Sequence, residues 1–349
     1  MVAFFLRAIP QLYWDDPWGE RHVDLRLMFG AMATYALVRR VQINATQWKG
    51  LIFALIFMGL AALYVTYLHG RATTSNPIAW AAAMTFGAST LLGLLFSQLT
   101  PTRALIPIFL GLIAFSIGVA LSQSRGAYGL FLWLPICLIG WISHLTLHSS
   151  LSKQKGRALG LGLLFLTAFS VTILSQPRLY QAPLERVQTA VAEGMAMMQK
   201  KDPGAINTSV GARLYMWQKS VDEIISSPLW GHGKPERLAL IRSWGEESNS
   251  ETVKSLGHVH NEYLQAPLDH GIWGLVSRVL PLVALLSVAW IMLATQTRHA
   301  AVALASISIM AILAGLTNVN TAHNYYGAML SLCVGLSFLS ACHRPRASG

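Results

Sequence analysis

Charged residues are scarce in this sequence. Only 12% of its 349 residues are Asp, Glu, Lys or Arg, about half the share that is usual in soluble domains. Large parts of the chain have no acid, because all 15 carboxylates lie within 15–24 or 185–269. Cysteine is also rare, with Cys137, Cys333 and Cys342 alone, and no disulfide framework is indicated. The composition therefore excludes an ordinary soluble domain and a disulfide-stabilised secreted one.

Apolar residues are abundant instead, at 54% of the chain. They form runs that approach the roughly 20 residues needed to cross a bilayer. Clear candidate spans are 51–68, 79–97, 104–121, 127–147, 158–175, 272–294, 300–317 and 324–341, and a weaker one is 25–38. Backbone in lipid must satisfy its own hydrogen bonds, so each span is expected to be helical. We predict an all-α polytopic membrane protein with about eight to nine transmembrane helices and one large helical loop.

Basic residues mark one side of the predicted membrane topology. The acid-free turns contain Arg39, Arg40, Lys49, Arg103, Lys153, Lys155, Arg157, Arg298, Arg344 and Arg346. Lys and Arg in short loops favour the cytoplasmic side, which places segment 176–270 outside. We therefore divide the chain into N-terminal transmembrane helices (1–175), an external loop (176–270) and C-terminal transmembrane helices (271–349). The net charge of +11 reflects this topology, and no nucleic-acid partner is expected.

The N-terminus is unusual for such a protein. Residues 1–14 are partly apolar but lack a basic region and a small-residue cleavage site, so no cleavable signal peptide is predicted. An acidic external tail then precedes the weak first span. This arrangement leaves open a start inside a longer chain that has further spans upstream.

The external loop has its own periodic structure. Apolar residues at helical spacing predict an amphipathic helix over 184–198 that lies on the membrane or covers a cavity. Ser209 is expected to cap a second helix that ends near Ser226. We expect that helix to bury Val210, Leu214, Val221 and Ile225. A glycine-rich turn at 228–233 and a polar, flexible connector at 234–255 follow.

The chemistry-bearing residues concentrate at 258–271, directly before an apolar run. Asn261 is a candidate N-cap of a helix that bends at Pro267 and continues into the membrane. His260 would stand at the outer membrane edge, where a neutral imidazole can accept a proton from a hydroxyl. The alternative is a histidine that only caps the helix or supports the loop. A metal site from His232, His258, His260, His270 and Asp269 is a weaker alternative, because the spacing supports it poorly.

Three arginines are candidates for binding phosphate, which suits their fork of donors. Arg125 lies in the external turn Ser124–Gly126, where the positive-inside bias disfavours it. Arg213 precedes Trp217 by four residues, so the two are neighbours on a helix. Arg278 lies inside a span, where charge is costly and normally faces a polar partner. Snorkelling to lipid headgroups or plain solvation is the alternative for each.

Asn76–Pro77 and the turn from His323 to Tyr326 add polar and aromatic groups on the same external side. Aromatic rings can stack on sugars. Aromatic residues also gather at membrane interfaces in general, so these are minor site candidates.

Several of these pieces resemble the O-antigen ligase and polymerase superfamily of membrane glycosyltransferases. The spacing H-N-x-x-L-x-x-x-x-x-x-G is formed by His260, Asn261, Leu264 and Gly271. Ser124-Arg125-Gly126 and Arg213-x-x-x-Trp217 are similar to further family pieces in the same order. The resemblance extends over roughly 75–341, and the family has more spans before the Ser-Arg-Gly turn than are found here.

The resemblance implies transfer of a glycan from undecaprenyl diphosphate to a lipid A-core sugar hydroxyl, with inversion and without metal or other cofactor. The place would be the periplasmic face of a bacterial inner membrane. His260 would act on the acceptor hydroxyl. Arg125, Arg213 and Arg278 would bind the donor diphosphate, with Asn261, His258 and Trp217 in support.

Alternatives remain open at this stage. An O-antigen polymerase or a protein O-oligosaccharyltransferase would share the chemistry and differ in the acceptor. A transporter or flippase would be expected to carry ionisable residues at mid-membrane, where this sequence has only His144 and Arg278. A structural membrane subunit would leave the external histidines and arginines without a role.

Overall fold

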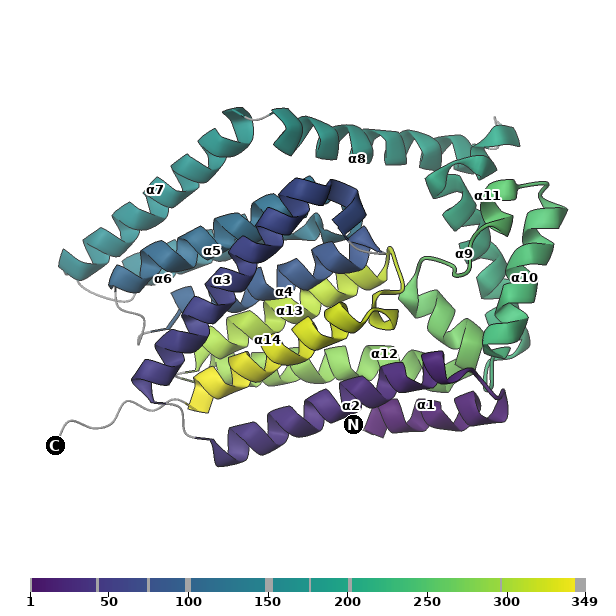
Figure 1. Cartoon of the computed structure of the whole chain (residues 1–349), viewed down its shortest axis with the longest axis horizontal. Helices are drawn as coiled ribbons and strands as arrows, with labels where there is room; N and C mark the ends of the chain where they lie inside the picture. The colour runs from purple at the N-terminus through teal and green to yellow at the C-terminus, as the bar shows by residue number, and fades with distance from the viewer. Residues whose placement is uncertain are drawn as a thin grey trace. The chain divides into compact units, whose positions relative to one another are not determined.

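The computed structural model describes residues 2–41, 44–73, 76–97, 102–147, 153–175, 177–199, 203–295 and 297–342. Every regular element in these ranges is helical, as predicted (Figure 1). The α-helices are α1 Val2–Tyr13, α2 Trp18–Arg40, α3 Ala45–His69, α4 Pro77–Leu95, α5 Thr102–Leu121, α6 Gly129–Leu147, α7 Lys153–Ser175, α8 Pro177–Met198, α9 Ser209–Ser226, α10 Gly233–Glu247, α11 Glu251–Lys254, α12 Glu262–Leu293, α13 Arg298–Gly315 and α14 Asn324–Cys342. Short 3-10 turns are η1 Gly70–Thr73, η2 Arg125–Ala127, η3 Pro203–Asn207 and η4 Asn320–Ala322.

Membrane-spanning character is confirmed for most of the predicted spans. Within the described ranges, six helices are long and apolar enough to cross a bilayer: Thr46–Ala72, Pro77–Leu95, Ala104–Leu121, Arg125–Thr146, Glu262–Leu293 and Arg298–Gly315. Helices α2, α7 and α14 cover the other predicted spans, at 25–38, 158–175 and 324–341. The chain is therefore an all-α polytopic membrane protein.

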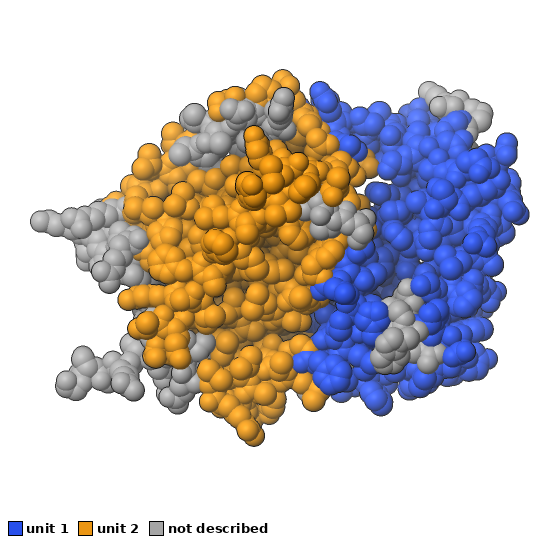
Figure 2. Space-filling model, viewed as in Figure 1, with its two compact units in different colours: residues 1–29, 184–283, 314–324 blue, residues 30–183, 284–313, 325–349 orange. Residues whose placement is uncertain are grey.

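The described residues form two compact units (Figure 2). Unit 1 consists of 1–29, 184–283 and 314–324, and unit 2 consists of 30–183, 284–313 and 325–349. Most of the predicted external loop thus shares a unit with the N-terminal helix α1 and with the first part of α12.

Unit 2 is a bundle of apolar helices. Helix α5 packs on both α3 and α4, and α6 packs on α4 and α7 (Figure 1). Nearly all of α4 is buried, and small residues such as Ala81, Ala82 and Ala83 line it. Small side chains let neighbouring helices approach closely, and dispersion then drives packing that lipid cannot supply.

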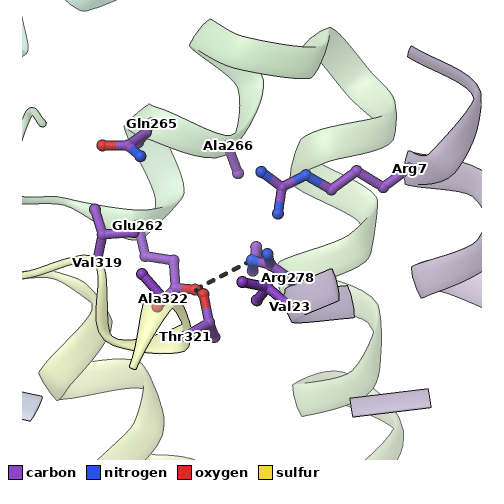
Figure 3. A pocket seen from close by; sticks show the side chains of 9 residues that line it. All are labelled: Arg7, Val23, Glu262, Gln265, Ala266, Arg278, Val319, Thr321 and Ala322. Atoms are coloured by element: carbon purple, nitrogen blue, oxygen red, sulfur yellow. Dashed lines mark hydrogen bonds and ion pairs between the residues drawn. The ribbon is translucent and has the colours of Figure 1, made fainter. Parts of the chain in front are cut away.

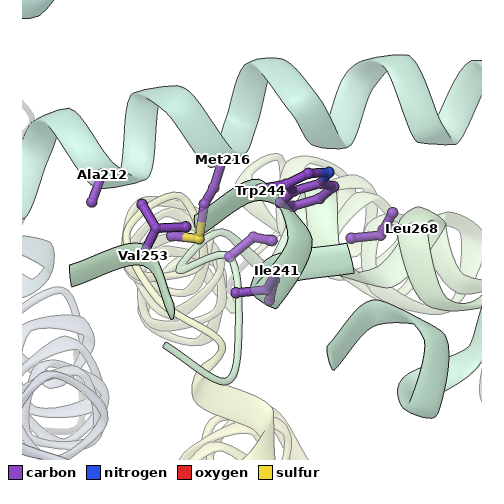
Figure 4. Close-up of a cluster of buried hydrophobic side chains, with 7 residues drawn as sticks. Ala212, Met216, Ile241, Trp244, Val253 and Leu268 are labelled. Carbon is purple, nitrogen blue, oxygen red and sulfur yellow. The ribbon is translucent and has the colours of Figure 1, made fainter. Parts of the chain in front are cut away.

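Unit 1 has a separate apolar core. Seven buried residues form it: Ala212, Met216, Ile241, Trp244, Val253, Val259 and Leu268. They come from α9, α10, α11, α12 and the segment before α12, and Figure 4 shows most of them pointing toward one another. The predicted flexible connector at 234–255 is therefore wrong, because α10 and α11 occupy most of it. Ile241 and Trp244, three residues apart on α10, supply the apolar face that anchors this segment.

Two details of the predicted second helix are also wrong. Thr208 is its N-cap in place of Ser209, with Thr208 Oγ1 accepting the Gly211 N–H at 3.1 Å. Val221 and Ile225 are exposed, at 43% and 71%. The buried face instead follows Ala212, Met216 and Ser220, whose four-residue spacing is equally helical.

The predicted amphipathic helix exists as the larger part of α8. Its apolar residues Leu184, Val187, Val191, Met195 and Met198 are all exposed. Glu193 fixes the helix to α9 by accepting the Val210 N–H at 2.9 Å. Its predicted position on the membrane or over a cavity stays a prediction.

Candidate functional site

His260 occupies a constrained piece of backbone just before α12. Its φ is +56°, a value that is uncommon for residues other than glycine and often marks functional positions. Trp217 Nε1 donates to the Val259 carbonyl at 2.8 Å on one side. On the other side, Asn261 Oδ1 accepts the N–H groups of Tyr263 at 2.9 Å and Leu264 at 3.3 Å. The predicted N-cap is confirmed, and both neighbours of His260 are held in place.

The ring of His260 is neutral in this environment. Burial, with smaller contributions from the nearby His258 and Arg213, lowers its pKa to about 2, and the Asn318 side chain opposes this shift in part. The His258 and His260 ring centroids are 4.0 Å apart. His260 Nδ1 is buried and has no hydrogen-bond partner among the described residues. A neutral imidazole with an unpaired nitrogen can accept a proton or a hydrogen bond from a hydroxyl.

Helix α9 brings Arg213 and Trp217 to the same place. Ala212 and Met216 on this helix are buried in the core of unit 1, and this burial fixes the rotation of the helix about its axis. The adjacent Arg213 is half-buried and close enough to His260 to act on its pKa. The structure thus unites four predicted site residues: His258, His260, Arg213 and Trp217. Arg213 and Trp217 lie more than 40 residues before His258 and His260 in the sequence, so tertiary packing creates the cluster.

Arg278 has two carboxylate partners. Its Nη1 lies 2.6 Å from Asp24 Oδ1, and its Nε lies 3.1 Å from Glu262 Oε1. Glu262 also accepts a hydrogen bond from the Thr321 hydroxyl. These groups border a cavity of about 20 Å³ (Figure 3), room for about one water molecule. Its lining residues are Arg7, Val23, Glu262, Gln265, Ala266, Arg278, Val319, Thr321 and Ala322. A diphosphate would have to compete with both carboxylates for Arg278.

The polar contacts around Arg278 continue into α1. Arg7 contacts Asp24 at 3.2 Å and donates from Nε to His270 Nδ1 at 2.9 Å. Because His270 Nδ1 accepts this bond, Nε2 carries the proton, and it lies 2.5 Å from Asp16 Oδ2. All of these side chains are buried. The N-terminal helix is thereby tied to α12 through ionisable groups.

The motif glycine has a clear structural role. Gly271 has φ +57° in a kink of α12, and a Cβ there would lie 2.3 Å from the carbonyl of Leu229. The Ile272 N–H donates to the Pro228 carbonyl at 2.8 Å across this contact. The helix therefore bends at His270–Gly271, and the predicted bend at Pro267 is wrong. Only glycine allows the turn at 228–233 to approach so closely.

Arg125 belongs to unit 2, in η2. Ser124 precedes it and donates from Oγ to the Pro77 carbonyl at 2.9 Å, which fixes the turn to the start of α4. The side chain of Arg125 is half-buried. Since Arg213 and His260 lie in unit 1, a shared role of Arg125 with them stays a prediction.

Two of the minor candidates, Asn76 and Tyr325, have structural contacts within unit 2. Asn76 caps α4 by accepting the N–H groups of Ile78 and Ala79. Tyr325 donates from its hydroxyl to the Asn76 carbonyl at 2.9 Å and packs edge-on against Trp80. These contacts give Asn76 and Tyr325 a structural role. Among the described residues, no group of three His, Cys, Asp or Glu side chains is placed to hold a metal ion.

Asn318 and Asn320 were not predicted as site residues from the sequence. Both are fully buried, and Asn318 faces His260. Asparagine is common in turns, so two asparagines in a turn do not by themselves indicate a functional site. Glu262 and Asp24 were not predicted as partners of Arg278, although an intramembrane arginine is normally paired and so calls for such partners.

Comparison with known proteins supports the resemblance. Residues 110–278 match the family model described as O-antigen ligase. A protein of Haemophilus influenzae described as uncharacterized is 25% identical over 178 residues, which cover 49% of this chain and 40% of the relative. The chain thus spans less than half of that relative's length. The Ser-Arg-Gly turn, Arg213, Trp217 and the motif from His260 to Gly271 all lie inside the matched range.

Proposed function

We propose that this chain is a membrane glycosyltransferase that moves a glycan from undecaprenyl diphosphate to a lipid A-core sugar hydroxyl. The match of residues 110–278 to the O-antigen ligase family model supports this proposal. The reaction would take place at the periplasmic face of the bacterial inner membrane, on the side of residues 176–270. The observation that carries the proposal is the neutral His260 ring beside Arg213.

The reaction is a single displacement. The acceptor hydroxyl oxygen attacks the anomeric carbon of the donor sugar, and the bond from that carbon to the diphosphate oxygen breaks. Its electron pair leaves with the undecaprenyl diphosphate, so the configuration inverts. The hydroxyl proton passes to His260, whose Nδ1 has no partner among the described residues. A neutral base is a precondition for this step.

Arg213 would stabilise the leaving group. A guanidinium fork suits diphosphate oxygens and stays charged at a half-buried position. Bound diphosphate would also offset the positive charge that lowers the pKa of His260. Donor binding would thus make His260 a stronger base at the moment when the acceptor is deprotonated. Arg125 is proposed as a second diphosphate ligand, on the strength of its external turn and its fork of donors.

Arg278 is a less direct candidate. The negative charges of Asp24 and Glu262 offset the positive charge of Arg278. We propose that it shapes the start of α12 beneath His260. A role in donor binding would require Asp24 or Glu262 to release it.

The test is transfer by the purified protein in lipid, with EDTA present. Undecaprenyl-diphosphate glycan and lipid A-core are supplied, and the wild type is compared with His260→Ala, Arg213→Leu and Arg125→Leu. The exposed His69→Ala and Arg242→Leu serve as matched controls. We expect transfer by the wild type and both controls, and losses of about 100-fold or more for His260→Ala, as for a lost general base.

The other outcomes separate the alternatives. Chain growth on the donor lipid without transfer to lipid A-core would identify a polymerase, and transfer to protein hydroxyls would identify an oligosaccharyltransferase. Full activity of His260→Ala would refute the assigned site. No transfer to any acceptor would refute the enzyme proposal and favour a transporter.

A further inference from the structure

The segment between α13 and α14 packs against the start of α12. Gly315 is so close to Tyr263 that a Cβ there would lie 2.9 Å from the tyrosine ring. Farther along, Thr321 donates to Glu262. Between these two contacts, Asn318 faces the ring of His260. The segment is thereby fixed on both sides of the position where it meets the histidine.

Two amides in this segment are buried and only partly hydrogen-bonded. Asn318 and Asn320 are each 0% exposed. Asn318 Nδ2 donates to Asn320 Oδ1 at 2.9 Å. Within the described residues, no hydrogen bond of normal geometry reaches Asn318 Oδ1, Asn320 Nδ2 or His260 Nδ1, although the Asn318 side chain is close enough to His260 to raise its pKa. If both amides are flipped, the pair still bonds once and still leaves one acceptor and one donor.

Unsatisfied buried polar atoms are costly and rare in native proteins, so a group of them calls for an explanation. Three such atoms in neighbouring side chains lie at the position proposed for catalysis. Hydroxyl groups fit this set well, since each both donates and accepts a hydrogen bond. Sugars carry hydroxyl groups on adjacent carbons. When one hydroxyl faces His260, the flanking hydroxyls therefore lie near the amide side chains beside His260.

We propose that Asn318 and Asn320 bind the hydroxyl groups of the acceptor sugar that flank the hydroxyl facing His260. The assignment rests on the proposed glycosyl transfer and extends it to the class of ligand and to the residues that select it. Both amides are fully covered in this structure, so the ligand reaches them by a shift of neighbouring side chains. Specificity follows because an acceptor that lacks a flanking hydroxyl leaves buried amide groups unpaired.

The test uses acceptor analogues. Transfer to lipid A-core is measured for the wild type, Asn318→Ala, Asn320→Ala and the control Thr317→Val, whose hydroxyl is already bonded to the Ala314 carbonyl. Each protein is given the natural acceptor and analogues in which one flanking hydroxyl is replaced by hydrogen. Donor KM and thermal unfolding are measured in parallel.

For the natural acceptor, we expect each asparagine variant to lower kcat/KM by about 5- to 100-fold, with donor KM unchanged. With the matching deoxy analogue, the same variant should cause little further loss, because the interaction is already absent. Thr317→Val should resemble the wild type throughout.

Equal losses with the natural and deoxy acceptors would overturn the assignment, and the amides would then only hold water or support the segment. Unchanged kcat/KM in both asparagine variants would overturn it as well. In either case the wild type still transfers glycan and the proposed function stands. A wild type that transfers to no acceptor refutes the function and this assignment together.

Discussion

Replacing Arg278 by leucine tests whether its carboxylate contacts hold unit 1 together. Within the group of Arg7, Asp24, Glu262 and Arg278, two positive and two negative charges balance. The Arg278, Asp24 and Glu262 side chains are only 6%, 4% and 7% exposed. Arg278→Leu leaves an uncompensated negative charge in this buried group. Breaking a buried ion pair from one side costs about 3–5 kcal/mol.

Unfolding of the purified protein in detergent, followed by heat or denaturant, measures this cost. The double variant Arg278→Leu with Glu262→Leu restores the balance and should recover at least about 1 kcal/mol of the loss. The exposed Arg242→Leu should change stability by less than about 0.5 kcal/mol. Wild-type stability of Arg278→Leu combined with a strong loss of donor binding would refute this reasoning and support the diphosphate role.

Three further predictions follow from the site. His260 has a folded pKa of about 2 against about 6.5 unfolded, so the unfolded state binds more protons below pH 6.5. Stability should therefore fall as the pH drops, by about 1–2 kcal/mol at pH 5 allowing for partial exposure. The buried His270 is also ionisable, and burial lowers the pKa of the half-buried His323. His260→Gln should therefore reduce this dependence of stability on pH without abolishing it, and equal slopes in the variant and the wild type would contradict the assignment. Gly271→Ala should destabilise by more than about 2 kcal/mol because of its positive φ and the contact with Leu229. Gly257→Ala, whose added Cβ would meet only the Leu238 side chain at 4.0 Å, should be tolerated. Arg213→Leu should weaken donor binding about 10-fold or more and raise the pKa of His260, observed by NMR titration; an unchanged pKa would show that the charge does not act there.

Local and periodic features of the fold were predictable from the sequence. Apolar runs gave the spans, and Asn261 was correctly predicted as a cap because its side chain bonds to the backbone nearby. The predicted N-cap at Ser209 was wrong by one position, because the preceding Thr208 is also a good capping residue. The predicted burial of Val221 and Ile225 was wrong because α9 has two apolar faces, and packing against α10 decides which of them is buried.

Features that depend on long-range contacts were not predictable. The bend at Gly271 is set by the turn at 228–233, which lies some 40 residues earlier in the chain. The partners of Arg278 come from α2 and from the start of α12, and no local pattern connects them. Likewise Asn318 is an ordinary turn residue until the fold places it against His260. The residue types of the site were visible in the sequence, but their neighbours were not.

The proposed glycosyl transfer is best tested by mass spectrometry of lipid A-core. The lipid is analysed after incubation with the purified protein and undecaprenyl-diphosphate glycan, with EDTA present. We expect the mass of lipid A-core to increase by the mass of the glycan with the wild type and with His69→Ala, and to stay unchanged with His260→Ala. Unmodified lipid A-core with the wild type, or full modification with His260→Ala, would contradict this proposal.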